Sequence, residues 1–465
     1  MEHIHQDENE RRQHEKFLRM TTGKPEKLIC QLAVPSIISM LITSFYNMAD
    51  TFFIAKLENT SATGAVGVAF SLMAIIQAFG FFLGHGSGNY ISRELGKKNL
   101  KNAEEMASTG FFTALIIGIL MMTAGLIFIN PLAKLLGSTD TILPYATNYI
   151  RYILIGCPYM CASIVLNNQL RFQSNAFFGM IGLATGAVLN IALDPIFIFM
   201  LDMGVSGAAI ATIISQFVSF VLLLIGMQKS DSLKIRLSNF RPCTAYFTQI
   251  CKGGAPSLFR QGLGSVAGIS LNFTAGNYGD SAIAAISIVS RIMMFAASAL
   301  IGFGQGFQPV CGFNYGARLY ARVKRSFVFC VKYASVFLVV LAVVLFIGAP
   351  QIIMQFQKED PQVISIGICA LRCQAVTFPF MAWVVMSNMM TQTIGKVYKA
   401  SLLAMSRQGI MFIPCVLILP LFFDIWGLLL AQPVADILSF IVALPIQISE
   451  MRELDRLTLE NPVKE

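Results

Sequence analysis

Apolar stretches alternate with short polar breaks along most of the chain, and each stretch is about 20 residues long, enough for a helix to cross the hydrocarbon core of a bilayer. Twelve such spans fit the sequence. They are predicted near 30–55, 62–89, 105–129, 143–168, 176–201, 205–227, 254–278, 282–308, 326–349, 363–391, 398–421 and 426–447. Spans 7 and 8 are the least sharply separated. The pattern predicts an all-α polytopic membrane protein with twelve transmembrane helices.

The composition agrees with this pattern. Of the 465 residues, 55% are hydrophobic and 13% are charged, against about 25% charged in a soluble domain. The mean hydropathy is +0.66, which excludes the class of soluble domains. The first 27 residues are strongly polar and contain no apolar segment of the kind found in signal peptides. We therefore expect them to form a cytoplasmic tail.

Basic residues predict the orientation of the spans, because they accumulate on the cytoplasmic side of a membrane. Of the 34 Lys and Arg, 25 fall in the two termini and the even-numbered loops, and only Lys56, Lys134 and Lys358 fall in the odd-numbered loops. Both termini are therefore expected in the cytoplasm. This topology accounts for the net charge of +9, so we expect no nucleic-acid partner.

Motifs of catalysis are missing from the sequence. The ten cysteines are scattered through the spans, and the pairs Cys157/Cys161 and Cys369/Cys373 lack the His or Cys companions of a zinc site. We interpret them as packing residues. No phosphate-binding GxxxxGK[ST] loop and no HExxH motif occur. The sequence therefore predicts neither an enzyme nor a pump driven by nucleotide hydrolysis, and no cofactor other than a coupling ion.

An internal repeat organises the chain. Residues 33–37 (AVPSI) correspond to 254–258 (GAPSL) at an offset of 221, and Gly84 and Gly96 correspond to Gly304 and Gly316 at an offset of 220. Each repeat holds six spans, so the two lobes should be related by a pseudo-twofold axis along the membrane normal. The predicted parts are a tail (1–27), an N-lobe with spans 1–6 (28–228), a cytoplasmic linker (229–253), a C-lobe with spans 7–12 (254–448) and a tail (449–465).

Two carboxylates lie inside apolar spans of the N-lobe. Asp50 ends the first span and Asp194 lies in the fifth, where a charge at mid-bilayer costs roughly 2.5–3.5 kcal/mol on the insertion scale. At the corresponding positions the C-lobe has Leu271 and Pro414. Because the second lobe repeats the spans without the acids, we interpret the acids as functional rather than structural.

Helical spacing gives these acids companions. Tyr46 and Asp50, Asn190 and Asp194, and Ala208 and Thr212 are each four residues apart, so each pair shares a helix face. Counting 1.5 Å per residue from the nearest loop puts Asp50, Asp194 and Thr212 each at roughly 9–12 Å below the outer boundary. Carboxylate, amide and hydroxyl oxygens suit hard cations such as Na⁺. Two nearby carboxylates also suit a proton carrier, so the residues leave Na⁺ and H⁺ open.

Polar residues elsewhere in the spans have two interpretations. Arg407 in the eleventh span and Asp436 in the twelfth lie at comparable depth, and we predict a structural ion pair. Gln261, Asn272 and Gln305 are uncharged polar residues of the C-lobe. They are candidates for lining a substrate cavity, but hydrogen bonding between helices is the commoner role of such residues.

Several of these segments resemble one known family. They are the span-opening Pro35, the stretch YNMADTFFIAKL, the paired loops SRELGKKN and GFNYGAR, and the sequence LNIALDP at 189–195. Together, over residues 28–450, the chain is similar to the multidrug and toxic compound extrusion (MATE) family, and within it to the DinF-like bacterial branch. The resemblance implies a multi-pass protein of the bacterial inner or plasma membrane. It would export amphipathic, often cationic compounds in exchange for inward-moving H⁺ or Na⁺.

The resemblance also implies roles for single residues. Asp50, Asn190, Asp194 and Thr212 match the cation-coupling cluster of that branch, and a bound Na⁺ would lie among them. Tyr46, Asn167 and Ala208 match secondary members, and Asn167 is also a candidate for the substrate cavity. Pro35 matches a proline about which the first helix bends, in keeping with the hydrogen bond that an interior proline removes.

One departure and several alternatives accompany the resemblance. The NorM-type branch carries acids in the seventh and tenth spans, where this chain has Val266 and no acid, so a cation site in the C-lobe is not expected. The main rival function is a flippase for lipid-linked precursors in the same superfamily. A channel or an intramembrane enzyme is a more distant alternative. Expected partners are small-molecule drugs, organic cations and the lipid bilayer, and we expect a monomer.

Overall fold

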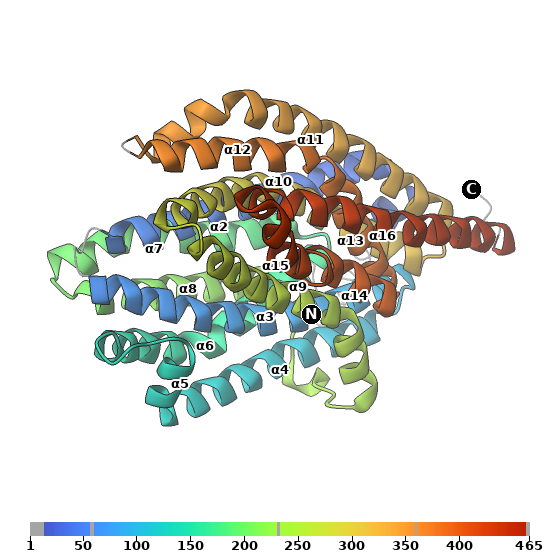
Figure 1. The fold of residues 1–465 in the computed structure, drawn as a ribbon. Helices are drawn as coiled ribbons and strands as arrows, with labels where there is room; N and C mark the ends of the chain where they lie inside the picture. The colour runs from blue at the N-terminus through green and yellow to red at the C-terminus, as the bar shows by residue number, and fades with distance from the viewer. Residues whose placement is uncertain (1–13, 56–59, 230–232, 359, 462–465) are drawn as a thin grey trace. The chain divides into compact units, whose positions relative to one another are not determined.

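The computed structural model describes residues 14–55, 60–229, 233–358 and 360–461. These residues form helices joined by short loops and contain no strand (Figure 1). Ten of their helices are long and apolar enough to cross a membrane. An eleventh candidate is a pair of helices bent by 56° at a short break. The prediction of an all-α polytopic membrane protein is confirmed.

The chain divides into two compact units. Unit 1 comprises Met1–Gly23 and Val34–Gly254, and unit 2 comprises Lys24–Ala33 and Ala255–Glu465. The division lies close to the boundary between the two sequence repeats. It differs from that boundary in one respect, because the short segment Lys24–Ala33 packs with the second half of the chain.

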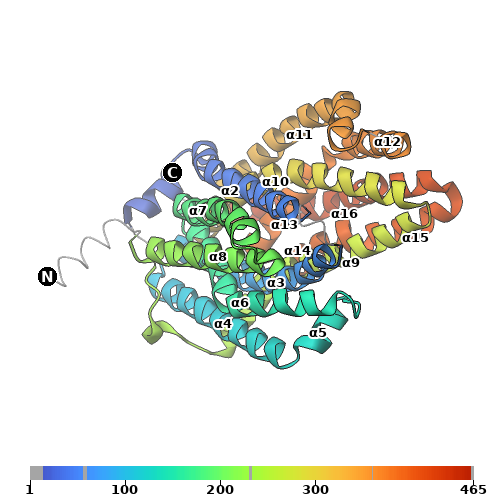
Figure 2. The same cartoon turned by 90° about the vertical axis from the view of Figure 1, so that its left-hand side faces the viewer.

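Helix α6 is the centre of unit 1. The helices of this part are α2 (Pro25–Ala55), α3 (Thr60–Gly96), α4 (Leu100–Ile127), α5 (Ile129–Leu135), α6 (Leu143–Phe172), α7 (Ala176–Pro195), the π-helix η1 (Ile196–Met200), α8 (Gly204–Lys229), the 3₁₀ turn η2 (Leu237–Asn239) and α9 (Thr244–Gly276). Helix α6 packs against α3, α4 and α8, and Figure 2 shows α4 and α6 side by side, as in Figure 1. Glycines permit the close approach, since a Cβ on Gly118 of α4 would lie 2.5 Å from the Pro158 Cα of α6.

Unit 2 repeats this plan with interruptions in two helices. Besides the start of α2 and most of α9, its helices are α10 (Asp280–Gly316), α11 (Tyr320–Phe356), α12 (Pro361–Thr377), α13 (Phe380–Ile394), α14 (Val397–Met405), the π-helix η3 (Ser406–Ile410), α15 (Phe412–Phe423) and α16 (Ile425–Glu460). The predicted tenth span is the bent pair α12 and α13, with Pro379 at the break. The predicted eleventh span is α14 and α15, with η3 between them.

A helix occupies each of the twelve predicted spans, but the seventh differs from the others. Helix α9 begins at Thr244, ten residues before the predicted span, and it is not among the helices that are apolar enough to cross a membrane. Its polar residues, among them Arg260, Gln261 and Asn272, lower its hydropathy. The first turns of α9 occupy the end of the segment 229–253 that the sequence assigns to a linker.

The division between the units passes through two helices at equivalent points. It separates Ala33 from Val34 in α2 and Gly254 from Ala255 in α9, in each case just before a proline, Pro35 or Pro256. The two prolines are 221 residues apart, which is the offset of the sequence repeat.

The segments of α2 and α9 that precede these prolines pack closely against glycines of other helices. In unit 1, a Cβ on Gly86 of α3 would lie 2.3 Å from the Ile250 carbonyl oxygen of α9. In unit 2, a Cβ on Gly306 of α10 would lie 2.5 Å from the Ala33 Cα of α2. The start of each repeat's first helix therefore packs within the unit that is built mainly from the other repeat.

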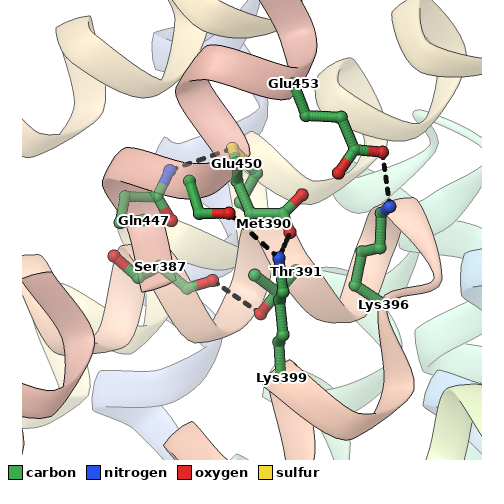
Figure 3. A network of polar contacts seen from close by, with 9 residues as sticks. Ser387, Met390, Thr391, Lys396, Lys399, Gln447, Glu450 and Glu453 are labelled. Carbon is green, nitrogen blue, oxygen red and sulfur yellow. Dashed lines mark hydrogen bonds and ion pairs between the residues drawn. The ribbon is translucent and has the colours of Figure 1, made fainter. Parts of the chain in front are cut away.

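A polar network joins three helices near the end of unit 2 (Figure 3). Lys399 of α14 pairs with Glu450 of α16, whose carboxylate is buried, and Lys396 pairs with Glu453. Gln447 Nε2 of α16 lies 3.5 Å from the Met390 sulfur of α13. Because the carboxylates of α16 are matched by the two lysines, we interpret this network as a structural tie between α14 and the end of α16.

Candidate ion-coupling site

Three of the predicted site residues meet between α7 and α8. Asn190 Nδ2 donates a hydrogen bond to Asp194 Oδ1 at 3.3 Å and another to Thr212 Oγ1 at 3.4 Å. Asn190, Asp194 and Thr212 are each at most 1% exposed. A buried carboxylate, amide and hydroxyl thus form one connected group, which we call the α7/α8 cluster. Such groups are stable in an apolar interior only when they are hydrogen-bonded or bind an ion.

The backbone after Asp194 places the two helices in register. Pro195 has no N–H to donate to the carbonyl of Ile191, and the chain continues as the π-helix η1. The loop then turns back, with Met203 N donating to Phe197 O at 3.2 Å. This short return brings Thr212, on the third turn of α8, to the level of Asn190. Single π-turns inside α-helices are frequently found at functional sites.

The remaining predicted members of the cluster lie on α2 and α8. Ala208 is fully buried, one turn before Thr212, and has no side-chain oxygen to offer. Tyr46 is buried on α2. Asp50 belongs to α2, but its side chain lies outside the described residues. The structure therefore brings together Asn190, Asp194 and Thr212, and it does not place the Asp50 carboxylate.

Asn167 lies away from this cluster. Its Nδ2 donates a hydrogen bond to the Gly179 carbonyl oxygen at 3.1 Å, which ties α6 to α7. Gly179 precedes Asp194 by 15 residues, or about 22 Å along the helix axis. Asn167 thus has the helix-joining role that is common for polar residues in membrane spans.

The three cavity candidates of the C-lobe have different surroundings. Gln261 is half-buried and Asn272 is exposed, both on α9. Gln305 is buried on α10, among the glycines Gly304 and Gly306 that contact neighbouring helices.

The predicted ion pair of the second half is confirmed. Arg407 Nε of η3 lies 2.8 Å from Asp436 Oδ1 of α16, and Gln432 Nε2 donates to the same oxygen at 2.9 Å. Asp436 corresponds to Ser215 at the repeat offset of 221. The second repeat therefore neutralises the Asp436 carboxylate with Arg407, whereas Asp194 accepts a hydrogen bond from the Asn190 amide.

Two polar residues near the α7/α8 cluster were missed by the sequence interpretation. Ser215 and Ser219 follow Thr212 on α8 by three and seven residues and are each 2% exposed. Their spacing is that of one helix face, so the sequence contained the signal. A serine in an apolar helix is common, however, and the spacing alone did not distinguish these two from the others.

Comparisons with known proteins agree with the fold and the repeat. The family model described as MatE matches residues 35–196 and again residues 256–417, at the same offset of 221. A multidrug export protein, MepA of Staphylococcus haemolyticus, is 28% identical over 422 residues, covering 90% of this chain and 92% of that protein.

Solved structures show the same architecture over nearly the whole chain. One is the outward-facing conformation of a multidrug resistance MATE family transporter of the MOP superfamily, with a TM-score of 0.89 and 26% identity over 94% of this chain and 98% of that one. Another is a MOP superfamily transporter from Pyrococcus furiosus, with a TM-score of 0.88, 26% identity and the same coverage. For that protein, a reversed polarity of the binding pocket suggests a different function.

Proposed function

Because the chain belongs to the MatE family, a family of membrane transporters and not of enzymes, we propose that it exports amphipathic, often cationic compounds in exchange for H⁺ or Na⁺. The names of its relatives support multidrug efflux. The observation that carries the coupling is the buried α7/α8 cluster, which supplies oxygen ligands inside the bilayer and has no counterpart in the second repeat.

The chemistry of the cluster supports ion binding. Asp194 offers a carboxylate, and Asn190 holds it by a hydrogen bond and offers its own Oδ1, which has no hydrogen-bond partner among the described residues. Thr212 adds a hydroxyl oxygen. Carboxylate, amide and hydroxyl oxygens are the ligands of hard cations, and a buried carboxylate also accepts a proton readily. Asp50, on the same face of α2 as Tyr46, would complete the site.

Transport would follow alternating access. In the outward-facing state, an H⁺ or Na⁺ would neutralise the Asp50/Asp194 pair, which removes its attraction for a cationic drug and releases the drug. The first helix would then bend at Pro35, where the hydrogen bond to the Gln31 carbonyl is missing. The ion would leave on the cytoplasmic side, where we expect both termini, and a new drug molecule would bind from the cytoplasm or the inner leaflet.

The decisive experiment compares two acids of the same segment. Asp194→Asn removes the charge and the proton site but keeps the shape, and Asp202→Asn changes an exposed acid in the loop after η1. Asn tolerates the positive φ of 51° at position 202. Ethidium flux is measured in everted vesicles with an imposed gradient of H⁺ or of Na⁺. We expect Asp194→Asn to lose ion-driven efflux while inserting normally, and Asp202→Asn to retain it. Retained efflux in Asp194→Asn would contradict the proposal.

A flippase for lipid-linked precursors is the second candidate, since a solved relative of this fold is thought to differ in function where its pocket polarity is reversed. A flippase of this kind would favour a basic cavity, whereas the described site of this chain is acidic. The same vesicles separate the two functions, because the absence of any ion-dependent ethidium flux in the wild-type protein would favour the flippase.

A further inference from the structure

A stripe of hydroxyl groups continues from the α7/α8 cluster along the interface of the same two helices. Thr212, Ser215 and Ser219 follow one face of α8 over seven residues, or about 10 Å. A Cβ on Gly186 of α7 would lie 2.9 Å from the Ser219 Cβ, 3.4 Å from its Oγ and 3.1 Å from the Ser215 carbonyl oxygen. The stripe therefore lies against α7, and the absence of a side chain at Gly186 allows the two helices to approach closely there.

Beyond Thr212, which accepts from Asn190, the hydroxyls of this stripe are buried and have no hydrogen-bond partner among the described residues. Ser215 Oγ, Ser219 Oγ and Asn190 Oδ1 make no hydrogen bond to any described residue. Other buried serines of unit 1 behave differently, since Ser39 Oγ donates to the Pro35 carbonyl and Ser163 Oγ to the Tyr159 carbonyl, four residues earlier. Such a bond to the preceding turn is the ordinary way to satisfy a serine in an apolar helix.

Leaving three polar groups unpaired in one interface is unfavourable inside a membrane, where water is not at hand to satisfy them. The free-energy cost of these unpaired groups disappears if a ligand that binds oxygen atoms occupies the interface between α7 and α8. One turn further along, a Cβ on Gly182 would lie 2.6 Å from the Leu223 Cγ, so the fully buried Leu223 side chain packs directly against α7.

We propose that Ser215 and Ser219, with Asn190 Oδ1, form an inner station for the coupling ion, between the α7/α8 cluster and Leu223. The ligand is a small cation that binds oxygen atoms, either Na⁺ or a hydronium ion that carries the proton. The inference rests on the proposed function and deepens it, because it extends the site toward the Ala176 end of α7. An ion that leaves Asp194 would pause at the hydroxyls before it passes Leu223.

The test uses the purified full-length protein and measures the ion directly. Ethidium is added to the protein in detergent, and the release of H⁺ is followed with a pH dye and the release of ²²Na⁺ by filtration, each as a function of ion concentration. Ser215→Ala and Ser219→Ala each remove one hydroxyl. We expect each to weaken the apparent affinity for the released ion by about 3- to 10-fold, as the loss of one ligand hydrogen bond predicts. Ser163→Ala is the matched control and should leave the affinity unchanged.

The melting temperature separates this role from a structural one. Because neither hydroxyl has a protein partner, both serine variants should melt at or above the wild-type temperature even though they bind the ion more weakly. A wild-type affinity in Ser215→Ala, Ser219→Ala and the double variant would overturn the inference. If Asp194→Asn loses ion release at the same time, the proposed function stands and the inner station alone fails. If Asp194→Asn also releases the ion like the wild type, the proposed function fails as well.

Discussion

Asn190 is the residue that organises the candidate site. Its amide nitrogen reaches Asp194 on its own helix and Thr212 on the next, and this arrangement turns its carbonyl oxygen away from both. One side chain thus orients the carboxylate, joins α7 to α8 and presents an oxygen of its own. A site for a small cation needs ligands fixed in this way, since a flexible ligand would pay an ordering penalty on binding.

Thr212 offers a test at this scale. Thr212→Val keeps the shape but removes the oxygen that accepts from Asn190, so the amide should lose one of its two restraints. We expect the concentration of H⁺ or Na⁺ that half-saturates drug efflux to rise about 3- to 10-fold. Thr212→Ser keeps the hydroxyl and should behave like the wild type. Equal efflux in Val and Ser variants would show that this hydroxyl has no part in coupling.

The sequence predicts those residues of the site that helical spacing places on one face of a helix. The four-residue spacing of Asn190 and Asp194 was visible, and so was the absence of both at the corresponding positions of the second repeat. Whether a hydroxyl bonds to its own helix is a question of side-chain rotamers, and no spacing rule answers it. Ser163 and Ser219 look alike in the sequence, yet only the first has a partner.

At the scale of the helices, glycine decides how closely neighbouring helices pack in this fold. On α3, Gly86 touches the backbone of α9, whereas a Cβ on Gly67 of the same helix would meet nothing within 4 Å. Gly86→Ala should therefore destabilise the protein by about 1–3 kcal/mol through overpacking against an atom that cannot move away. Gly67→Ala should be neutral or stabilise by up to about 1 kcal/mol, as helix propensity predicts. Melting temperatures in detergent compare the two, and a similar shift in both would contradict the packing argument.

The ion pair between η3 and α16 gives a second prediction for helices. Asp436→Leu leaves the Arg407 guanidinium without its carboxylate, and we expect a loss of about 3 kcal/mol, near the lower end for a buried pair because Arg407 is 21% exposed. Replacing both residues, as Arg407→Met with Asp436→Leu, should restore most of the stability. Drug efflux by the double variant tests the structural role, and its loss would instead point to a part in transport.

The sequence predicted the positions of the helices more accurately than their ends and interruptions. The length of each apolar run predicted where a helix lies, because a helix of that length crosses a bilayer without unpaired backbone groups, although α9 is not among the candidate spans. The start of α9 at Thr244 was not visible, since its first turns are polar. The π-helices η1 and η3 were not visible either, because one extra residue in a turn leaves the apolar run unbroken.

The start of each repeat's first helix packs within the unit that is built mainly from the other repeat, and we call this the exchange of helix starts. At the scale of the whole molecule, the exchange has a direct test. The two halves 1–243 and 244–465 are expressed together as separate chains. Each half carries a segment whose packing partners lie in the other half, so we expect the halves to copurify. Gly306→Val should weaken copurification, because its side chain would collide with the backbone at Ala33. Gly262→Val, where a Cβ meets nothing within 4 Å, is the control. Equal recovery of both variants would show that the exchange does not hold the halves together.

The same exchange sets an order for biosynthesis. Ala33 leaves the ribosome about 270 residues before Gly306, the glycine against which it packs. At about 5–20 residues per second, the delay is roughly 15–55 seconds. During that interval the start of the first helix has no permanent neighbour within its own unit. Helix α2 is thus made before its packing partner in unit 2, and a fault in its N-terminal turns would affect folding only when the second half of the chain is inserted.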